Sequence, residues 1–165
     1  MVWSPVLSYN EMNPICSLII CMDNLSYKLV TNAAELQGAL AVRRQVFIEE
    51  QGIAEDIELD EYDREALHMV VKDGQRVIGT ARVRFLADGQ AKLERMAVLK
   101  PLRRRGIGRE IIAFLNEELR NRQIEQVILH AQHSAIVFYK SSGFEESGSS
   151  FWEAGIKHTK MQRSI

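Results

Sequence analysis

Several features that define other protein classes are scarce in this sequence. The 165 residues contain two cysteines, Cys16 and Cys21, and both precede the region with regular secondary-structure patterning. A disulfide framework therefore does not hold the fold together, and we expect a reducing, cytoplasmic location. The formal net charge is −1, with 21 Lys and Arg against 22 Asp and Glu. Because proteins that coat nucleic acid carry a clear basic excess, we expect no nucleic-acid partner.

Long hydrophobic runs are also missing. The sustained apolar run in the first two dozen residues covers residues 18–22, which is too short to span a bilayer. No Lys or Arg precedes Lys28, so a secretory signal with a positive start is not indicated. We therefore expect no membrane partner. We interpret residues 1–25 as an N-terminal extension, either poorly structured or upstream of a true start near Met22, with a short strand or dimer contact as the alternative.

From residue 26 onward the sequence has the patterning of a single domain, residues 26–165, long enough to bury a core without disulfides or metals. Residues 26–30 predict a strand. Asn32 and Glu35 have the spacing of a capping box, and helical spacing continues to about residue 50 through Leu36, Leu40, Val46 and Phe47. Three antiparallel strands are predicted next at residues 67–71, 76–85 and 92–98, with turns at Asp73-Gly74 and Asp88-Gly89.

An arginine- and glycine-rich segment follows the strand at residues 92–98. It reads Arg-Arg-Arg-Gly-Ile-Gly-Arg over residues 103–109, and an amphipathic helix follows with Ile111, Ile112, Leu115 and Leu119 on one face. Glycines at a strand-to-helix turn let a ligand approach the backbone, and exposed N–H groups at a helix start bind anions. We therefore predict a phosphate or pyrophosphate site. The Gly-Lys-Ser/Thr ending of a P-loop and the third glycine of a dinucleotide fingerprint are both missing.

A second pattern follows one helix and one strand later. Residues 126–131 predict a buried strand, and a short helix then ends in Phe138-Tyr139 followed by Gly143-Phe144. Gly143 stands where a helix needs a left-handed cap, and Phe144 is expected to start the next strand. Two such patterns in this order rarely arise by chance.

Together these patterns resemble the GNAT acetyltransferase superfamily. Residues 103–108 are similar to its pyrophosphate motif Arg-x-x-Gly-x-Gly, and residues 138–144 are similar to its second signature. The resemblance extends from residue 26 to about residue 163, and residues 46–52 and 151–158 resemble a subgroup of small bacterial members with mostly unsettled substrates. It implies an α/β fold with a mixed, mainly antiparallel twisted sheet of six or seven strands and about four helices. Two central strands should splay apart after the first signature.

The resemblance also implies acetyl-CoA as cosubstrate and transfer of its acetyl group to a primary amine by direct attack on the thioester. The cofactor-binding residues it implies are Met96, Ala97, Val98, Arg103, Arg104, Arg105, Gly106, Ile107, Gly108, Arg109, Gln132 and Phe138. Gln132 stands where the family usually has an asparagine. A CoA-binding regulatory module without turnover, and an anion or nucleic-acid patch formed by the arginines, are the alternative functions. We expect no metal, because His130 and His133 have no Cys or carboxylate at ligand spacing.

The catalytic candidates follow from the reaction. An alkyl amine has a pKa near 10.4, so only about one part in a thousand is neutral at pH 7 and a proton must be removed. Glu94 is our candidate base, acting through water. An exposed strand carboxylate paired with Arg82, Arg84 or Arg95 is an equally supported interpretation.

The same resemblance assigns the remaining catalytic roles. Tyr139 matches the family's general acid for the leaving thiolate, with a core aromatic as the alternative. A backbone N–H near Met96 to Val98 would stabilise charge on the attacked carbonyl. His158 is either a structural histidine or one that faces the acceptor cleft, whereas His68 and His130 are interpreted as core or edge residues and His133 as a helix cap.

An acidic segment bears on the acceptor. Its residues are Glu49, Glu50, Glu55, Asp56, Glu58, Asp60, Glu61 and Asp63. A concentrated negative field would attract a cationic amine such as a polyamine, an aminoglycoside or a lysine-containing peptide. A solvated loop is the alternative, and Arg43 and Arg44 on the preceding helix oppose a uniformly negative field. We expect a small-molecule or peptide amine as partner and leave a homodimer open.

Overall fold

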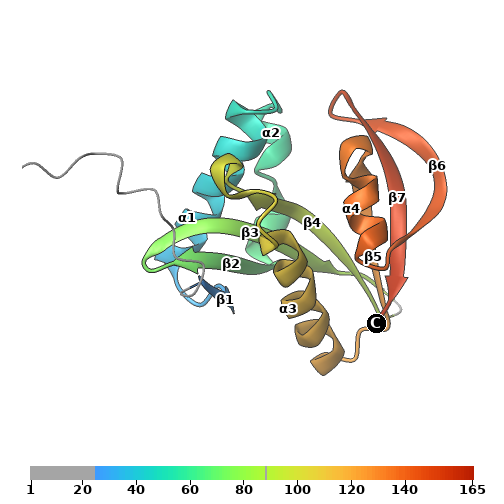
Figure 1. The fold of residues 1–165 in the computed structure, drawn as a ribbon, viewed down its shortest axis with the longest axis horizontal. Helices are drawn as coiled ribbons and strands as arrows, with labels where there is room; N and C mark the ends of the chain where they lie inside the picture. Colours follow the sequence, from blue (N-terminus) through green and yellow to red (C-terminus); the bar gives the residue numbers. More distant parts are fainter. Residues whose placement is uncertain (1–24, 88) are drawn as a thin grey trace, which may run out of the picture.

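The computed structural model describes residues 25–87 and 89–165, so Cys16, Cys21 and nearly all of the predicted N-terminal extension lie outside the described residues. Seven strands form one sheet in the order β1-β2-β3-β4-β5-β7-β6 (Figure 1). Their bounds are β1 Leu25–Leu29, β2 Leu67–Asp73, β3 Arg76–Phe85, β4 Gln90–Val98, β5 Gln126–Gln132, β6 Glu145–Glu153 and β7 Ile156–Ser164. The described residues also form four α-helices, which confirms the predicted mixed α/β fold.

The strands pair in chain order over the first half of the sheet. β2, β3 and β4 pair antiparallel, which confirms the predicted three-strand meander, and β1 adds antiparallel to β2. The chain then crosses through α3 (Ile107–Asn121), and β5 adds parallel to β4. Such a crossover is needed because parallel neighbours cannot be joined by a tight hairpin. β7 and β6 extend the sheet antiparallel, and β6 begins one residue after the predicted start at Phe144.

The junction of β4 and β5 is the feature that creates the site. These strands pair only from Gln90 opposite Gln126 to Leu93 opposite Leu129. On the β3 side of β4, the register shifts between Thr80 and Arg82, and Arg95 has a φ of 52°. This is a β-bulge, which bends the strand and increases its twist. Residues 94–98 therefore diverge from residues 130–132, in agreement with the expected splay (Figure 1).

The first helix is longer than a regular α-helix. α1 (Ala33–Arg43) continues as the π-helix η3 (Arg44–Glu49), in agreement with a helix to about residue 50. The Asn32 side chain accepts a hydrogen bond from the Glu35 N–H at 2.9 Å. The Glu35 carboxylate accepts from the Thr31 N–H at 3.0 Å instead of the N–H of Asn32. The predicted capping box is thus half formed, with Asn32 as its cap.

The buried face of α1 differs from the predicted one. Leu36 and Leu40 are only half-buried, whereas Ala39, Val42 and Arg43 are buried. The helix approaches β3 so closely that a Cβ on Gly38 would lie 2.5 Å from Cγ2 of Val77. Small side chains therefore face the sheet, and the leucines are turned to the margin of the contact. Of the four apolar positions predicted along this helix, Val46 and Phe47 are buried, whereas Leu36 and Leu40 are not.

The remaining helices are short except for α3. The short α-helices are α2 Glu55–Glu58 and α4 Ile136–Ser141. The 3₁₀ helices are η4 Glu61–Arg64, η5 Lys100–Leu102 and η6 His133–Ala135. Within residues 25–87 and 89–165, no helix combines the length and apolar character that crossing a bilayer requires.

The two faces of the central strands have different chemistry. On one face, Val83, Leu93 and Val127 enclose a small internal space together with Ile112 and Leu115 of α3. These apolar side chains are all buried. Because side chains alternate along a strand, the residues next to Val83 and Leu93 point to the other face. They are the charged residues Arg82, Arg84, Lys92 and Glu94, which line a cavity.

Candidate active site

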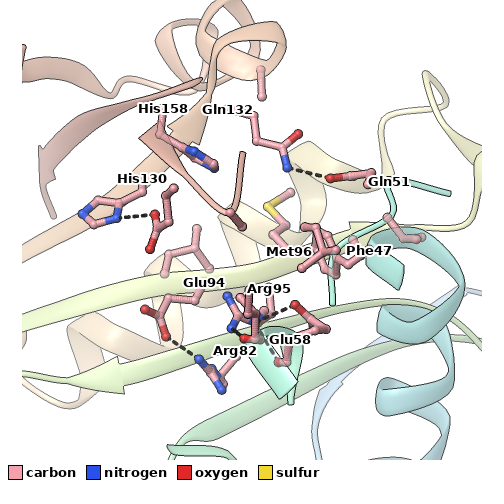
Figure 2. A pocket seen from close by; sticks show the side chains of 18 of the residues that line it. Phe47, Gln51, Glu58, Arg82, Glu94, Arg95, Met96, His130, Gln132 and His158 are labelled. Carbon is pink, nitrogen blue, oxygen red and sulfur yellow. Dashed lines mark hydrogen bonds and ion pairs between the residues drawn. The ribbon is translucent and has the colours of Figure 1, made fainter. Parts of the chain in front are cut away.

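Two cavities meet where β4 separates from β5. The α3 cavity has a volume of about 520 Å³ and is lined by Met96, Ala97, Val98, Leu102, Arg103, Arg104, Gly106, Ile107, Gly108, Arg109, Ala135, Phe138 and Tyr139. The second, here called the charged cavity, has a volume of about 450 Å³ and reaches from η3 and α2 across β3, β4 and β5 to β6 and β7 (Figure 2). Both cavities are lined by Met96, Ala97, Val98, Arg103, Ala135 and Tyr139.

The α3 cavity lies at a helix N-terminus with free donors. Gly106 precedes α3 with a φ of 87°, and no side chain caps this end. The N–H groups of Arg109 and Glu110 bond to the carbonyl of Gly106. Among the described residues, no acceptor is found for the N–H groups of residues 104–108. Unpaired donors and the helix dipole favour an anion here, which fits the predicted pyrophosphate site.

Gly108 provides the close approach that this site needs. A Cβ at this position would lie 3.1 Å from Cζ of Phe138 and 3.3 Å from Cε of Met96. A larger side chain would therefore fill the space between α3, α4 and the end of β4. The contact between Gly108 and Phe138 places the two predicted sequence patterns, residues 103–108 and 138–144, against one another.

The four arginines of the motif occupy different surroundings. Arg104 and Arg109 line the α3 cavity, whereas Arg105 is exposed and lines neither cavity. Arg103 lines both cavities, and its guanidinium holds the Glu50 carboxylate through two hydrogen bonds of 2.6 and 2.7 Å. Its Nε donates to the carbonyl of Val98 at 2.8 Å. The hydrogen bonds from Arg103 lower the pKa of Glu50.

Tyr139 stands at the boundary between the cavities. Its hydroxyl is 3.8 Å from Sδ of Met96, which is a weak acceptor. The ring packs edge-on against Phe138 and Phe144, which fixes its position. Burial raises the pKa of Tyr139 to about 12, so the hydroxyl keeps its proton at neutral pH. Tyr139 lies on α4, which ends at Ser141. Gly143 follows with a φ of 85°, in agreement with the predicted left-handed cap.

A network of buried ion pairs forms the floor of the charged cavity. Arg43 is fully buried, and its Nε lies 2.6 Å from Oε1 of Glu58. Its Nη1 lies 2.6 Å from Oδ1 of Asp63, which also accepts from Arg82 at 2.8 Å. Burial acts to raise the pKa of Asp63, but the hydrogen bonds from Arg43 and Arg82 outweigh it and lower that pKa to about 2. The network therefore keeps Asp63 ionised.

Arg95 links this network to the bulge of β4. Its Nε lies 2.9 Å from Oε2 of Glu58, and its Nη2 lies 3.2 Å from Oδ2 of Asp60 (Figure 2). Burial raises the pKa of Glu58, and the charges of Arg95 and Arg43 act in the opposite direction. Ion pairs thus link the bulge of β4 to α2 and the residues that follow it.

The expectation of one exposed acidic loop was wrong for three of its eight acidic residues. Glu58 is 1 % exposed, and it lies with Asp60 and Asp63 among arginines. The segment contains α2 and η4 because these carboxylates turn inward to neutralise Arg43, Arg82 and Arg95. Neither a recruiting negative field nor a solvated loop describes these three residues. Arg43 was missed as a core residue, although it is in helical phase with Ala39.

Glu94 is held by cations on two sides. Its carboxylate accepts from Nη2 of Arg82 at 2.9 Å and lies 2.8 Å from Nζ of Lys92. Burial acts to raise the pKa of Glu94, but Lys92 and Arg82 outweigh it and lower that pKa. The side chain lines the charged cavity. Its pairing with Arg82 agrees with the ion-paired alternative to a base, but the expectation that this carboxylate is exposed was wrong, because its side chain is only 10% exposed.

Two histidines face the same cavity from the opposite side. His130 on β5 and His158 on β7 both line it, together with Glu153 at the end of β6 (Figure 2). Nδ1 of His130 lies 3.0 Å from Oε2 of Glu153. The position of His130 in the cavity was not predicted, because the pair with Glu153 spans 23 residues and has no sequence signal.

Gln132 bridges the opening between the two arms of the sheet. Its Nε2 donates to Oε1 of Gln51 at 2.7 Å (Figure 2). The side chain lines the charged cavity and not the α3 cavity, so its predicted cofactor contact stays a prediction. In the described part of the chain, no group of three or more metal-ligating side chains is found.

Comparison with known proteins adds the family. The family described as "Acetyltransferase (GNAT) domain" matches residues 30–165. The N-acetyltransferase YjcF of Bacillus subtilis, itself described as uncharacterised, is 38% identical over 136 residues, which cover 82% of this chain and 96% of that protein. The uncharacterised protein YyaT of the same organism is 38% identical over 144 residues, with coverages of 86% and 97%.

Solved structures share the fold. A crystal structure from Lactobacillus plantarum, provisionally assigned as an N-acetyltransferase, superposes with a TM-score of 0.82 at 25% identity, covering 86% of this chain and 99% of that one. Escherichia coli ElaA gives a TM-score of 0.75 at 22% identity, with coverages of 84% and 99%. With a family match over most of the chain and the same fold in these structures, this protein belongs to the GNAT acetyltransferase family.

Proposed function

We propose that the protein is an acetyl-CoA-dependent N-acetyltransferase that transfers the acetyl group to a primary amine by direct attack on the thioester. The observation that carries this proposal is the shared wall at the end of β4. Six residues, Tyr139 among them, line both the α3 cavity and the charged cavity. A donor in one cavity and an acceptor in the other would therefore meet at that wall.

The α3 cavity suits a CoA donor. The unpaired N–H groups of residues 104–108, with Arg104 and Arg109, offer a pyrophosphate the donors and charge that it needs. Leu102, Ile107 and Phe138 give the cavity apolar walls for an uncharged chain. Acetyl-CoA would supply the activated acetyl group as a thioester. No metal is required by this chemistry.

The end of β4 would hold the reacting carbonyl. Beyond Leu93 the strand has no partner on its β5 side, so its N–H groups on that edge are free to donate. Positioned donors that face developing negative charge lower the barrier of acyl transfer. N–H groups alternate between the two edges of a strand, and the N–H of Leu99 donates to the carbonyl of Ile78 on the β3 side. Among Met96, Ala97 and Val98, Val98 therefore has its N–H on the open edge.

Tyr139 would act on the leaving sulfur. A thiol has a pKa near 8.5, whereas the pKa of Tyr139 is about 12. Full proton transfer is uphill by roughly 5 kcal/mol on these values, so its main contribution is a hydrogen bond to the developing thiolate. Met96 Sδ is a weak competitor for that hydroxyl.

Calorimetry with acetyl-CoA tests the donor half of the proposal. We expect micromolar binding by the full chain and a loss of ~100-fold or more in Gly108→Trp, because the indole would fill the space next to Phe138. Val137→Trp is the matched control, since Val137 is 79% exposed on α4 and lines neither cavity. Its affinity should stay within ~2-fold of the unmodified protein. Absence of binding by the unmodified chain would overturn the proposal.

Release of free thiol tests the transfer half. The panel contains polyamines, aminoglycosides, lysine-containing peptides and free amino acids, each added to protein and acetyl-CoA. Amine-dependent thiol release, with the acetylated amine identified by mass, supports the proposal. Binding of acetyl-CoA without release by any amine favours the regulatory CoA-binding module instead.

A further inference from the structure

The charged cavity contains few groups that are free to take a proton from an amine. Glu58, whose pKa burial raises, is only 1% exposed and so offers an amine almost no surface. Asp60 is paired with Arg82 and Arg95, and Glu94 accepts from Arg82 and lies beside Lys92. A carboxylate held by two cations is a weak proton acceptor, because protonation would break both interactions. The acceptor side therefore needs another base.

His158 has the tautomer that such a base requires. Its Nδ1 lies 2.9 Å from the carbonyl oxygen of Ile156. A carbonyl only accepts, so Nδ1 carries the ring proton and Nε2 keeps a lone pair. Among the described residues, Nε2 has no hydrogen-bond partner. In the described part of the chain, the buried side-chain N and O atoms without a partner are Nδ1 of His68 and Nε of Arg82. Nε2 of His158 is not among them, so this unpartnered atom is accessible, and the side chain lines the charged cavity.

The surroundings of His158 fix its ring beside the reacting wall. The residue is 8% exposed, and its ring stacks on Phe151 with centroids 6.0 Å apart. It pairs across the sheet with Gln132, beyond the point where β5 leaves β4. In Figure 2 its ring lies beside Gln132 on the arm that faces Met96 across the cavity. It shares this cavity with Tyr139.

We infer that His158 is the catalytic base of this enzyme, accepting at Nε2 the proton that the amine loses on attack; this inference rests on the proposed function. The amine lone pair forms the N–C bond, and the nitrogen gives one proton to Nε2. The C–S bond breaks, and its electron pair leaves with sulfur, which accepts a hydrogen bond from the Tyr139 hydroxyl and then takes one proton from solvent to become the thiol. The proton on His158 returns to solvent. An amine and acetyl-CoA thus yield an amide and CoA.

His130 is the competing histidine, and its surroundings differ. Its Nδ1 is bound to Glu153, whose side chain is 50% exposed, and its own side chain is 28% exposed. His130 pairs with Lys160, whereas His158 pairs with Gln132. His130 therefore lies two residues nearer the end where β4 and β5 are paired. The other charged groups that line the cavity are Glu58 on α2, Asp60 after α2, Arg82 and Arg84 on β3, Lys92, Glu94 and Arg95 on β4, Arg103 after β4 and Glu153 on β6. The geometry therefore favours His158 as the group nearer the open end.

Nitrogen NMR of the imidazole rings tests the inference without any acceptor. The full chain labelled with ¹⁵N is compared with His158→Asn to assign the ring, and the spectra are recorded above the titration of the histidines. We expect His158 to show a protonated Nδ1 and an unprotonated Nε2. A spectrum with the proton on Nε2 would overturn the inference, whether or not an acceptor is found.

Turnover of the best amine from the panel provides the second arm. His158→Asn keeps a donor for the Ile156 carbonyl but lacks the Nε2 lone pair, so kcat should fall ~10²- to 10⁴-fold. The Kd for acetyl-CoA should stay unchanged. The acidic limb of the kcat/KM profile contains the ionisation of the amine as well as that of the base, and only the part due to the amine should remain in His158→Asn. His133→Asn, on an exposed histidine that lines neither cavity, should retain full turnover.

Chemical rescue separates a lost base from a damaged fold. His158→Ala opens space for free imidazole, and added imidazole should restore part of kcat. Turnover by His158→Asn within ~3-fold of the unmodified protein, with the acidic limb unchanged, would overturn the inference. Loss of the part of the acidic limb due to the base in His130→Asn but not in His158→Asn would do the same. Failure of the unmodified chain to bind acetyl-CoA would instead defeat the proposed function.

Discussion

The α3 cavity and the charged cavity adjoin each other, yet they are built in different ways. The α3 cavity draws its lining from residues 96–109 and residues 135–139, so two short segments supply it. The charged cavity draws on residues from Val46 to His158 and on η3, α2 and five strands. The difference teaches that a donor site can be carried by local motifs, whereas this acceptor site depends on pairings between distant segments.

The energetics of the two regions differ as well. The α3 cavity leaves donors unpaired, which costs little while water can reach them. The charged cavity lies against a network of paired charges, centred on the buried Arg43, whose separation would leave a buried ion. We therefore expect substitutions at the charged floor to act mainly on stability and substitutions at the α3 cavity to act mainly on binding and turnover.

The largest effect is expected for Arg43→Met. Removing this cation leaves Glu58 and Asp63 without a main partner, which should lower the free energy of unfolding by ~3–5 kcal/mol. Arg44→Met is the matched control, because Arg44 and its partner Glu55 are both about half exposed. It should change stability by ~0.5 kcal/mol or less. Denaturant unfolding measures both, and equal losses in the two variants would contradict the contrast.

Acid should weaken the same region. The pKa of Asp63 is about 2 in the folded protein, below the value of 3.8 for a free side chain. A lowered pKa contributes stability above pH ~4 that is lost as the pH falls toward ~2, here amounting to about 2 kcal/mol. Unfolding followed between these pH values measures it. Asp63→Asn should remove that part of the pH dependence, whereas Asp56→Asn, at an exposed carboxylate, should leave it in place.

Tyr139→Phe tests the wall between the cavities. Loss of a hydrogen bond to a developing charge should raise the barrier by ~1.5–3 kcal/mol, lowering kcat by roughly one to two orders of magnitude. The Kd for acetyl-CoA should stay within ~2-fold, because the ring and its packing remain. Steady-state kinetics and calorimetry separate these effects. Unchanged kcat in Tyr139→Phe would remove the hydroxyl from the mechanism.

The smallest effect concerns two neighbouring arginines that the motif does not distinguish. Arg104 lines the α3 cavity and Arg105 does not. Arg104→Ala should weaken acetyl-CoA binding by ~0.5–1 kcal/mol, or roughly two- to fivefold, and the loss should shrink at high salt. Arg105→Ala should bind as the unmodified protein does. Equal losses measured by calorimetry would mean that overall charge, and not position, attracts the cofactor.

Glu94 and His158 show where prediction from sequence reached its limit. Position on a strand was enough to place Glu94 at the cavity, because side chains alternate along β4. Whether its carboxylate was free depended on Arg82, twelve residues away, and Lys92. His158 was recognised as a residue that could face the acceptor, but its tautomer depends on the turn that brings the Ile156 carbonyl to Nδ1. Neither state has a local sequence signal.

The sequence by itself determined the three-strand meander, the α3 and α4 motifs and the family, because these rest on short-range periodicity, turns and helix caps. The buried face of α1 and the inward turn of the acidic segment were decided by tertiary structure. Close packing at Gly38 placed small residues against β3, and burial of Arg43 and Arg82 required Glu58, Asp60 and Asp63 as partners. Charges far apart in the chain must neutralise one another when they leave water, and only the folded chain selects the pairs.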